Sequence, residues 1–442
     1  MRAPERRTPR VVVLGGGHVG LTAALRLRSK LRCGEAHVTL VDRQPHMTYQ
    51  PFLAEVAAGL LRPGNVVVPL RAALPGCDVR TGHVTRVDTS ARRVDLELPV
   101  GTPEHLHYDV LVVAVGSISR ASPIPGLAEQ GIGFRSLGEA VYLRHHVLSR
   151  LDAAASTTDA DLREPLLTFV FVVGGGYAGV EAVAELESMA REASRNHPTL
   201  RTQDMRWVLV DVADRILPEV SAAMGDYARQ RLHERGVDVK LGTRVLTVED
   251  GKVEFSDGDT AEADTIVWTT GVIPHPLVET IGLTRDDSGR LATTTKLQVR
   301  GTHEVFAAGD CAAVPDPAAD DPDATCGPSA RHAVRQARTL ADNVVALLRG
   351  RQLTDYEPTH VGSVAGLGLH HGIAEVHGIT LKGVPAWALR RAHHVAKMPT
   401  ALAKLRVVAE WFTRPLFRRQ VTSLEGLQDP HREFLVATGR AG

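Results

Sequence analysis

The sequence is poor in the features that mark secreted, membrane-spanning and metal-binding proteins. It has four cysteines in 442 residues, and no two of them form a C-x-x-C or another close pair. A disulfide framework, a zinc cluster and a redox-active cysteine pair are therefore not expected, and the composition favours a reducing compartment. No uninterrupted apolar run reaches about 18 residues, so no membrane-spanning helix is expected. The basic first residues are not followed by the apolar stretch of a secretory signal.

The charges show no surplus of either sign. Lysine and arginine together number 51, and aspartate and glutamate also number 51. This balance argues against a protein that binds nucleic acid over its whole surface. None of the 20 histidines stands at a spacing to cysteine or acid that indicates a metal site, so no metal is expected. A chain of this length exceeds one ordinary core, and two or three domains are expected.

What the chain does contain is an alternation of short apolar segments and helical patterns, which predicts an α/β fold. The segment "RVVVLGGG" is typical of a strand that enters a glycine turn and a helix, and "AHVTLVD" is typical of a second strand that ends in an acid. The same plan restarts near Leu166 with "LLTFVFVVGGG", the helical pattern "YAGVEAVAELESMAREA" and the strand pattern "RWVLVD". The duplication predicts two Rossmann-like dinucleotide-binding domains.

The first glycine motif joins the first predicted strand to its helix. Gly15, Gly17 and Gly20 have the G-x-G-x-x-G spacing, and Asp42 ends the next strand about 20 residues later. The first glycine permits the tight turn, the second permits close approach to a pyrophosphate, and the third lets the helix pack on the strand. The helix N-terminus attracts phosphate, and the acid can accept hydrogen bonds from a ribose hydroxyl. The motif predicts a bound dinucleotide; the alternative is a glycine-rich turn without a ligand.

The second glycine motif consists of Gly174, Gly176 and Gly179, and its candidate acid is Asp211. An acid at that position repels a 2′-phosphate, so NADH is favoured over NADPH, although the neighbouring Arg215 weakens this preference. Asp211 could also be a solvated acid at a strand end. Two such motifs suggest two dinucleotides, because a bound flavin can take a hydride from a nicotinamide that comes and goes.

The order of the remaining motifs resembles that of a known family. "AVGS" follows the first motif, and "TTGVIP" and "VFAAGDCA" follow the second, as in the two-dinucleotide flavoprotein reductases. The segments "MTYQPFLAEVAAGLL", "GGGYAGVEAVAEL", "ADRILPEV" and "GPSARHAVRQARTLADN" are similar to those of the type II NADH dehydrogenases. These are single-subunit, non-pumping NADH:quinone oxidoreductases, and the resemblance covers roughly residues 10–420. It implies that hydride passes from NADH to FAD and that a quinone then takes two electrons.

The resemblance also implies a division into domains. We expect an FAD-binding domain over residues 8–125 and 291–378, with an NAD(H)-binding domain over residues 126–290 inserted in it. Residues 379–442 form a basic amphipathic C-terminal segment for a membrane interface or a dimer.

The resemblance further assigns roles to single residues. Glu181 and Gln50 are expected to be catalytic, Glu181 by steering the nicotinamide or relaying a proton. Simpler readings stay open: Glu181 stabilises a helix N-terminus, and Gln50 is a loop residue. The expected FAD contacts are Gly15, Gly17, His18, Gly20, Asp42, Arg43, Gln50, Val84, Gly116, Gly309 and Asp310. The expected NAD contacts are Gly174, Gly176, Gly179, Glu181, Asp211 and Gly271.

The expected acceptor pocket contains Pro51, Arg331 and Gln336. Here the chain departs from the family pattern A-Q-x-A-x-Q-Q-G, because Arg331 and Arg335 replace glutamines. An arginine in the pocket adds a permanent cation that could favour an anionic acceptor, unless these side chains point to solvent. Two alternatives to quinone reduction stay open. One is a soluble NAD(P)H reductase for an acidic small molecule or a carrier protein, and the other is an NADH-sensing flavoprotein that docks a partner.

The C-terminal region combines many basic residues with apolar residues at helical spacing. Residues 386–420 could lie on a membrane surface through apolar burial and attraction to anionic lipid. The stripe could equally pack on the protein's own core or on a second copy in a homodimer. The expected location is cytoplasmic, with peripheral attachment to the inner face of the cell membrane as the form that the family suggests.

Overall fold

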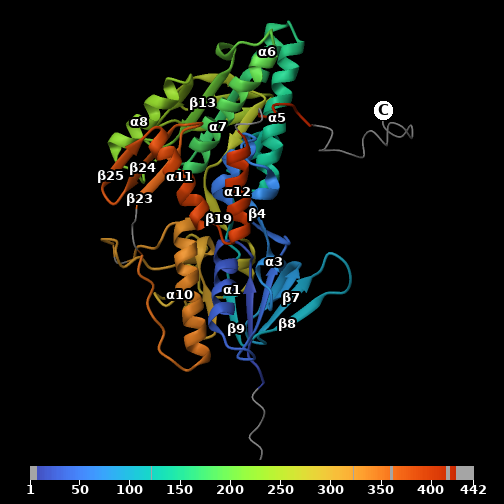
Figure 1. Ribbon diagram of the computed structural model, residues 1–442, viewed down its shortest axis with the longest axis vertical. Coiled ribbons are helices and arrows are strands. Elements are labelled where there is room, and N and C mark those ends of the chain that lie inside the picture. The colour runs from blue at the N-terminus through green and yellow to red at the C-terminus, as the bar shows by residue number, and fades with distance from the viewer. Residues whose placement is uncertain (1–6, 121, 322, 359–361, 415–418, 425–442) are drawn as a thin grey trace, which may run out of the picture. The chain divides into compact units, whose positions relative to one another are not determined.

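The computed structural model describes residues 7–120, 122–321, 323–358, 362–414 and 419–424 (Figure 1). The chain forms two compact units, each made of segments that are distant in sequence. Unit 1 comprises Met1–Tyr49, Val67–Ile118 and Val272–His360, and unit 2 comprises Gln50–Val66, Ser119–Gly271 and Val361–Gly442. These limits differ from the expected domain boundaries, chiefly because Gln50–Val66 and the whole C-terminal part belong to unit 2. The assignment of one cofactor to each domain stays a prediction.

Unit 1 is built on a five-stranded parallel sheet in the order β21-β9-β1-β2-β5. Its strands are β1 (Arg10–Leu14), β2 (His37–Asp42), β5 (Asp78–Thr81), β9 (Val110–Val113) and β21 (Val305–Ala307). The central strands are buried along nearly their whole length, which is typical of a parallel sheet covered on both faces. Helices α1 (His18–Lys30) and α10 (Ala330–Leu348) lie side by side (Figure 1).

Unit 1 also contains a smaller antiparallel sheet. It consists of β6 (His83–Asp88), β7 (Arg93–Glu97) and β8 (Glu104–His107). The register of β6 and β7 shifts between Val84 and Arg86, as in a β-bulge. Val84, an expected flavin contact, therefore lies where the strand changes direction locally.

Unit 2 repeats the parallel sheet in the order β11-β18-β12-β13-β14. Its strands are β11 (Gly131–Gly133), β12 (Thr168–Val173), β13 (Arg206–Asp211), β14 (Val237–Lys240) and β18 (Thr265–Trp268). The helix expected from the pattern after the second glycine motif is α7 (Tyr177–Ala193), with the predicted limits. The two parallel sheets confirm the predicted α/β class with two Rossmann-like cores.

Further elements of unit 2 cover α7. Helices α2 (Leu53–Ala57) and α5 (Leu137–Ser156) pack against it. An antiparallel sheet of β23 (Gly362–Gly366), β24 (Gly372–Val376) and β25 (Ile379–Lys382) lies beside α11 (Val384–Lys397) (Figure 1). The last described helix is α12 (Ala401–Thr413). Residues 415–418 and 425–442, which belong to the expected C-terminal segment, lie outside the described residues.

The helices do not include a candidate for a membrane span. Within the described ranges, none combines the length and the apolar character that crossing a bilayer requires.

Candidate functional site

The first glycine turn has the geometry of a dinucleotide loop. Gly15 has a φ of +97°, and a Cβ there would overlap the carbonyl oxygen of Ala114. A Cβ on Gly20 would overlap the carbonyl oxygen of Gly15. In contrast, a Cβ on Gly17 would meet no described atom within 4 Å. Gly17 is the N-cap residue just before α1, and among the described side chains none caps that helix. Open space in front of uncapped N–H groups fits the pyrophosphate of a dinucleotide.

Asp42 holds this turn from the end of β2. Its Oδ2 accepts the N–H of Gly16 at 2.5 Å, and its Oδ1 accepts the N–H of Gln44 at 2.7 Å. The carboxylate therefore shapes the loop before any ligand arrives. Each oxygen has a second lone pair, so a hydrogen bond from a ribose stays possible and stays a prediction.

Gln336 of α10 holds the turn of the "GDCA" motif in place. Gly309 has a φ of +75° and donates its N–H to Oε1 of Gln336 at 2.8 Å. Asp310 accepts a hydrogen bond from Oγ of Ser117 at 2.6 Å. Gln336 is 2% exposed. The residue expected in the acceptor pocket is thus buried, and it holds the backbone that carries Asp310.

His18, the first residue of α1, carries a buried imidazole. Burial lowers its pKa to about 4, although the charge of Asp310 acts in the opposite direction. The ring is therefore neutral at physiological pH, and its Nε2 has no hydrogen-bond partner among the described residues. A buried, unpaired ring nitrogen at the start of α1 is consistent with a cofactor contact.

The other residues expected around the flavin and the acceptor have varied settings in unit 1. Gly116 has a φ of +68° directly after β9, and Arg43 is exposed beside Asp42. Arg331 lies in the first turn of α10, where its N–H bonds to Oγ of Ser329 at 3.2 Å. Arg331 and Arg335 are both half-buried, so neither points freely into solvent.

The second glycine turn opens α7 in the same way. A Cβ on Gly176 would meet no described atom within 4 Å, and the described residues provide no side-chain cap for α7. A Cβ on Gly179 would overlap the side chains of Val173 and Thr269. Gly271 has a φ of +66° directly after β18. This cradle also fits a dinucleotide pyrophosphate.

Asp211 is buried, with an exposed fraction of 1%. Its Oδ2 accepts the N–H of Gly175 at 2.8 Å, and its Oδ1 accepts the N–H of Ala213 at 3.0 Å. Burial raises the pKa of Asp211, and these backbone donors partly offset that effect. Arg215 is a cation of the kind that binds a 2′-phosphate, but its guanidinium donates to the carbonyl oxygens of Pro218 and Val220. This arrangement favours NADH over NADPH.

Glu181 lies one turn into α7, where it forms a buried ion pair. Its Oε1 accepts Nε of Arg390 at 2.6 Å and the N–H of Gly366 at 2.7 Å. Its Oε2 accepts Nη2 of Arg390 at 2.8 Å. The bidentate pair fixes the orientation of the carboxylate.

Arg390 connects Glu181 to two other parts of unit 2. Its Nη1 donates to Oε1 of Glu55 at 3.0 Å, and its Nη2 donates to the carbonyl oxygen of Pro51 at 3.1 Å. Burial by itself lowers the pKa of Arg390, but the carboxylates of Glu181 and Glu55 raise it above its usual range. Arg390 therefore stays charged and brings the expected residues Pro51 and Glu181 together.

Glu55 is the second carboxylate of this buried group. It also accepts Nη2 of Arg391 at 3.4 Å and Nε1 of Trp411 at 3.2 Å. The guanidinium of Arg391 lies over the rings of Trp387 and Trp411, at 4.1 Å and 4.6 Å from their centroids. These contacts attach α11 and α12 to α2.

The burial of Arg390 and Arg391 corrects one expectation from the sequence. Both lie within residues 386–420, the candidate membrane-surface segment, but both are buried against Glu55. The sequence does contain a signal for Glu55, because it is the acid inside the apolar run "FLAEVAAGLL". No local signal marks Arg390, whose partners are more than 200 residues away. Gln50, expected to be catalytic, is exposed and donates to the carbonyl oxygen of Arg135 at 3.2 Å.

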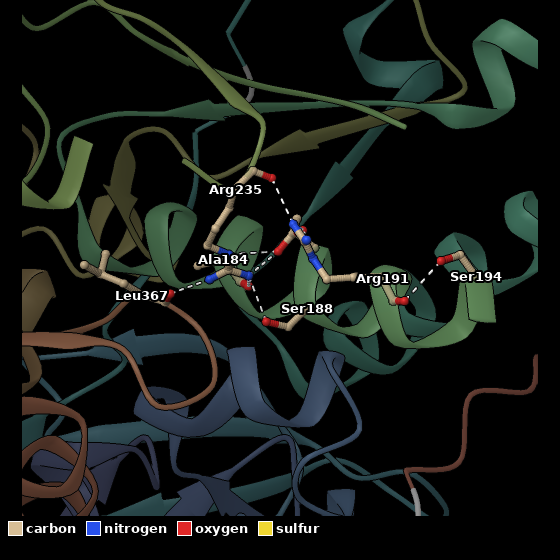
Figure 2. Close-up of polar contacts among 7 residues, drawn as sticks. Ala184, Ser188, Arg191, Ser194, Arg235 and Leu367 are labelled. Carbon is tan, nitrogen blue, oxygen red and sulfur yellow. Dashed lines mark hydrogen bonds and ion pairs between the residues drawn. The ribbon is translucent and has the colours of Figure 1, made fainter. Parts of the chain in front are cut away.

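A second arginine, Arg235, holds the end of β23, where Gly366 donates its N–H to Glu181. Arg235 follows α8 (Ala222–His233) and donates to the carbonyl oxygens of Ala184 and Leu367 and to Oγ of Ser188 (Figure 2). Its guanidinium also binds the buried carboxylate of Glu187 on α7. Leu367 directly follows Gly366 at the end of β23. Arg235 thereby helps to position the N–H group of Gly366, from which Glu181 accepts a hydrogen bond.

The two buried cysteines, Cys311 and Cys326, have thiols of low reactivity. All four are free thiols, and burial raises the pKa of Cys311 and of Cys326 to about 11. Such thiols stay protonated and are poor nucleophiles at neutral pH. In the described part of the chain, no group of three or more histidine, cysteine or acidic side chains could hold a metal ion.

Comparison with known proteins gives a consistent picture. Residues 9–337 match the family model described as pyridine nucleotide-disulphide oxidoreductase. The chain is 30% identical to the type II NADH:quinone oxidoreductase Ndh of Mycobacterium tuberculosis, over 92% of this chain and 88% of that protein. It is also 30% identical to the demethylphylloquinone reductase NdbB of Synechocystis, over 92% of this chain and 96% of that protein. NDH2 from Plasmodium falciparum, solved in complex with NADH, has the same fold, with a TM-score of 0.86, 16% identity, and coverage of 94% of this chain and 100% of that one.

Proposed function

Because the chain belongs to the pyridine nucleotide-disulphide oxidoreductase family, and within it to the type II NADH:quinone oxidoreductases, we propose that it binds FAD, oxidises NADH and reduces a quinone. The observation that carries this proposal is the pair of glycine turns, each open in front of an uncapped helix and each held by an acid at a strand end. FAD, when bound, supplies the hydride acceptor and the two-electron donor.

The residues of the chain bind and orient the reactants. The N–H groups at the starts of α1 and α7 hold the two pyrophosphates. Asp211 keeps the second turn in shape and disfavours the additional phosphate of NADPH. Arg390 fixes Glu181, whose place in the first turns of α7 supports its role next to a nicotinamide. Asp310, held by Ser117, is the expected contact for the ribityl-phosphate part of FAD.

The test of this function follows the flavin absorbance of the purified protein without oxygen. NADH should bleach the flavin rapidly, and a short-chain quinone should then restore the absorbance. NADPH should bleach it more slowly than NADH. A preparation without flavin, or a flavin that NADH does not reduce, would contradict the proposal.

The nature of the acceptor has a second candidate, which the arginines of α10 favour. Arg331 and Arg335 are half-buried in the first turns of that helix, so they could bind an acceptor with a negative charge. An Arg331→Gln, Arg335→Gln double variant should then lose much more activity with a carboxylated quinone than with a neutral one. Equal losses with both acceptors would remove the reason for this candidate.

We also propose that α12 attaches the protein to a membrane surface, where quinones are found. Its exposed side includes Leu402, Leu405 and Phe412, with exposed fractions of 58%, 64% and 79%. Lys397 and Arg406 are exposed near these residues. Apolar side chains next to cations suit the interface of an anionic bilayer. The inner face of the cell membrane is the location that this proposal implies.

Sedimentation with vesicles tests the attachment. A Leu405→Ala, Phe412→Ala variant should lose most of its binding to vesicles that contain anionic lipid. Leu162 provides a matched control, because it is 63% exposed on α6 (Ala160–Leu167). If Leu162→Ala reduces binding as strongly, or if the double variant still sediments fully, α12 is not the attachment site.

A further inference from the structure

Besides Glu181 and Glu187, helix α7 carries a third buried acid, Glu185, which has no assigned role at either glycine turn. Glu185 follows Glu181 by four residues, so the two side chains lie on the same face of the helix. Glu185 is 3% exposed. Among the described residues, its Oε2 has no hydrogen-bond partner.

Two of the buried cations near Glu185, Arg390 and Arg391, are already paired with Glu181 and Glu55. Arg390 donates to Glu181 and to Glu55, and Arg391 donates to Glu55. Neither guanidinium donates a hydrogen bond to Glu185 in the described structure. Arg390 and Arg391 thus pair with Glu181 and Glu55, and Arg419 pairs with Glu192 at 3.3 Å, so none of these ion pairs includes Glu185. A charged carboxylate with a buried oxygen that accepts no hydrogen bond is unfavourable in such surroundings, whereas the neutral acid is less so.

The charges around Glu185 come from several elements. Burial and the charge of Glu55 raise the pKa of Glu185 to about 7, against the opposing effect of nearby arginines. Helix α5, which also packs against α7, contributes charged and titratable residues of its own. The charges that act on Glu185 belong to Glu55 on α2, Arg390 and Arg391 on α11, Arg414 after α12, and Arg419. The titratable and charged residues of the packed helices also include Glu181 on α7 and Arg144, His145 and His146 on α5.

We propose that Glu185 keeps a proton at neutral pH and is the store from which Glu181 is protonated during turnover. In this step the O–H bond of Glu185 breaks and an O–H bond forms on Glu181, whose pair with Arg390 opens. A proton from solvent then restores Glu185. The step moves one proton and no electrons, and it needs no additional reactant.

The reaction creates a need for such a store. This part of the inference rests on the proposed quinone reduction, in which NADH, one proton and a quinone give NAD⁺ and a quinol. The hydride brings one hydrogen to the quinol, and the second must come from water through the protein. A buried acid one helical turn from Glu181 can hold that proton without exposing the site to solvent.

Infrared spectroscopy of the oxidised holoenzyme tests the store directly. At about pH 6 the wild-type protein should show the carbonyl band of a buried protonated carboxyl, and the band should disappear as the pH rises to about 9. Glu185→Gln should lack this band. Glu164→Gln is the matched control, because Glu164 is an exposed glutamate on α6, and it should retain the band. A wild-type spectrum without the band, or a band that persists in Glu185→Gln, overturns the proposal.

Single-turnover kinetics test the use of the proton. Bleaching by NADH should be nearly unchanged in Glu185→Gln, whereas recovery with a short-chain quinone should be at least about tenfold slower below pH 7. In the wild type this recovery should slow as the pH passes about 7, and in the variant it should be independent of pH in that range. An unchanged recovery rate in the variant overturns the role of Glu185 and leaves the oxidoreductase function intact. Failure of NADH to bleach the wild-type flavin would instead contradict the proposed function.

Discussion

The helices that follow the two glycine turns differ far more than the turns themselves. Both turns have a glycine that opens onto empty space and an acid that holds the backbone from a strand end. Helix α1 has no acid, and its ion pair with α10 joins side chains that are about one third exposed, Arg26 and Asp342. Helix α7 instead buries three glutamates, Glu181, Glu185 and Glu187.

The difference separates two tasks that similar turns can serve. In unit 1 the helix only has to present its N-terminus and pack, so its polar residues other than His18 remain near solvent. In unit 2 the helix also carries ionisable groups into a dry interior, where each charge needs a partner. The buried acids of α7 are therefore the part of the molecule in which single substitutions should have the largest effects.

The largest effect is expected from Arg390→Ala. This change removes the partner of two buried carboxylates, and breaking such a pair typically costs about 3–5 kcal/mol. Thermal or urea unfolding measures the loss. Arg390→Lys keeps the charge but not the bidentate geometry, and it should recover part of the stability. A loss below about 1 kcal/mol in Arg390→Ala would show that the group is not buried as described.

Glu185→Gln should have an effect that depends on pH. The pKa of Glu185 is 4.5 when unperturbed and about 7 in the folded protein, so the folded state holds the proton more tightly. Its contribution to stability is complete below about pH 4.5 and is lost as the pH rises through 7, by up to about 1.4 kcal/mol per pH unit. The variant lacks this loss and should be more stable than the wild type at about pH 8. Parallel stability–pH curves for the two proteins would contradict this prediction.

The two packing glycines offer a direct comparison of the turns. In Gly20→Ala the new methyl group would meet backbone, the carbonyl oxygen of Gly15, which cannot move aside. In Gly179→Ala it would meet the side chains of Val173 and Thr269, which would have to move but are less fixed than backbone. We expect Gly20→Ala to cost about 3 kcal/mol and to lose flavin during purification, and Gly179→Ala to cost less and to retain flavin. Flavin content and unfolding curves measure both, and equal losses would remove the contrast.

The smallest effect is expected from Asp342→Asn, which breaks the ion pairs that join α1 and α10. Arg26 and Lys30 reach Asp342 at 2.6 Å and 2.7 Å, but all three side chains are at least 30% exposed. Exposed pairs typically contribute about 1 kcal/mol or less, and salt weakens them. Unfolding at low and high salt should show a small difference that shrinks with added salt. A loss of stability as large as that of Arg390→Ala would contradict the expected difference between α1 and α7.

Much of this protein could be predicted from local sequence. The glycine spacing, the apolar strands and the strand-end acids identify both Rossmann-like cores, because a pyrophosphate loop needs those residues at those positions. The limits of α7 agree with the helical pattern that follows the second glycine motif. Asp42 and Asp211 were found as the acids of the loops, although their bonds to Gly16 and Gly175 are visible only in the structure.

The tertiary structure alone decided what surrounds Glu181. Its partner Arg390 and the further acid Glu55 come from α11 and α2, and the basic pattern around Arg390 indicated a surface segment rather than a buried one. A short motif reports the needs of a local turn, whereas the pairing of buried charges depends on which distant helices pack together. The sequence therefore determined where two dinucleotides are expected, and the packing of unit 2 determined which charges meet on α7.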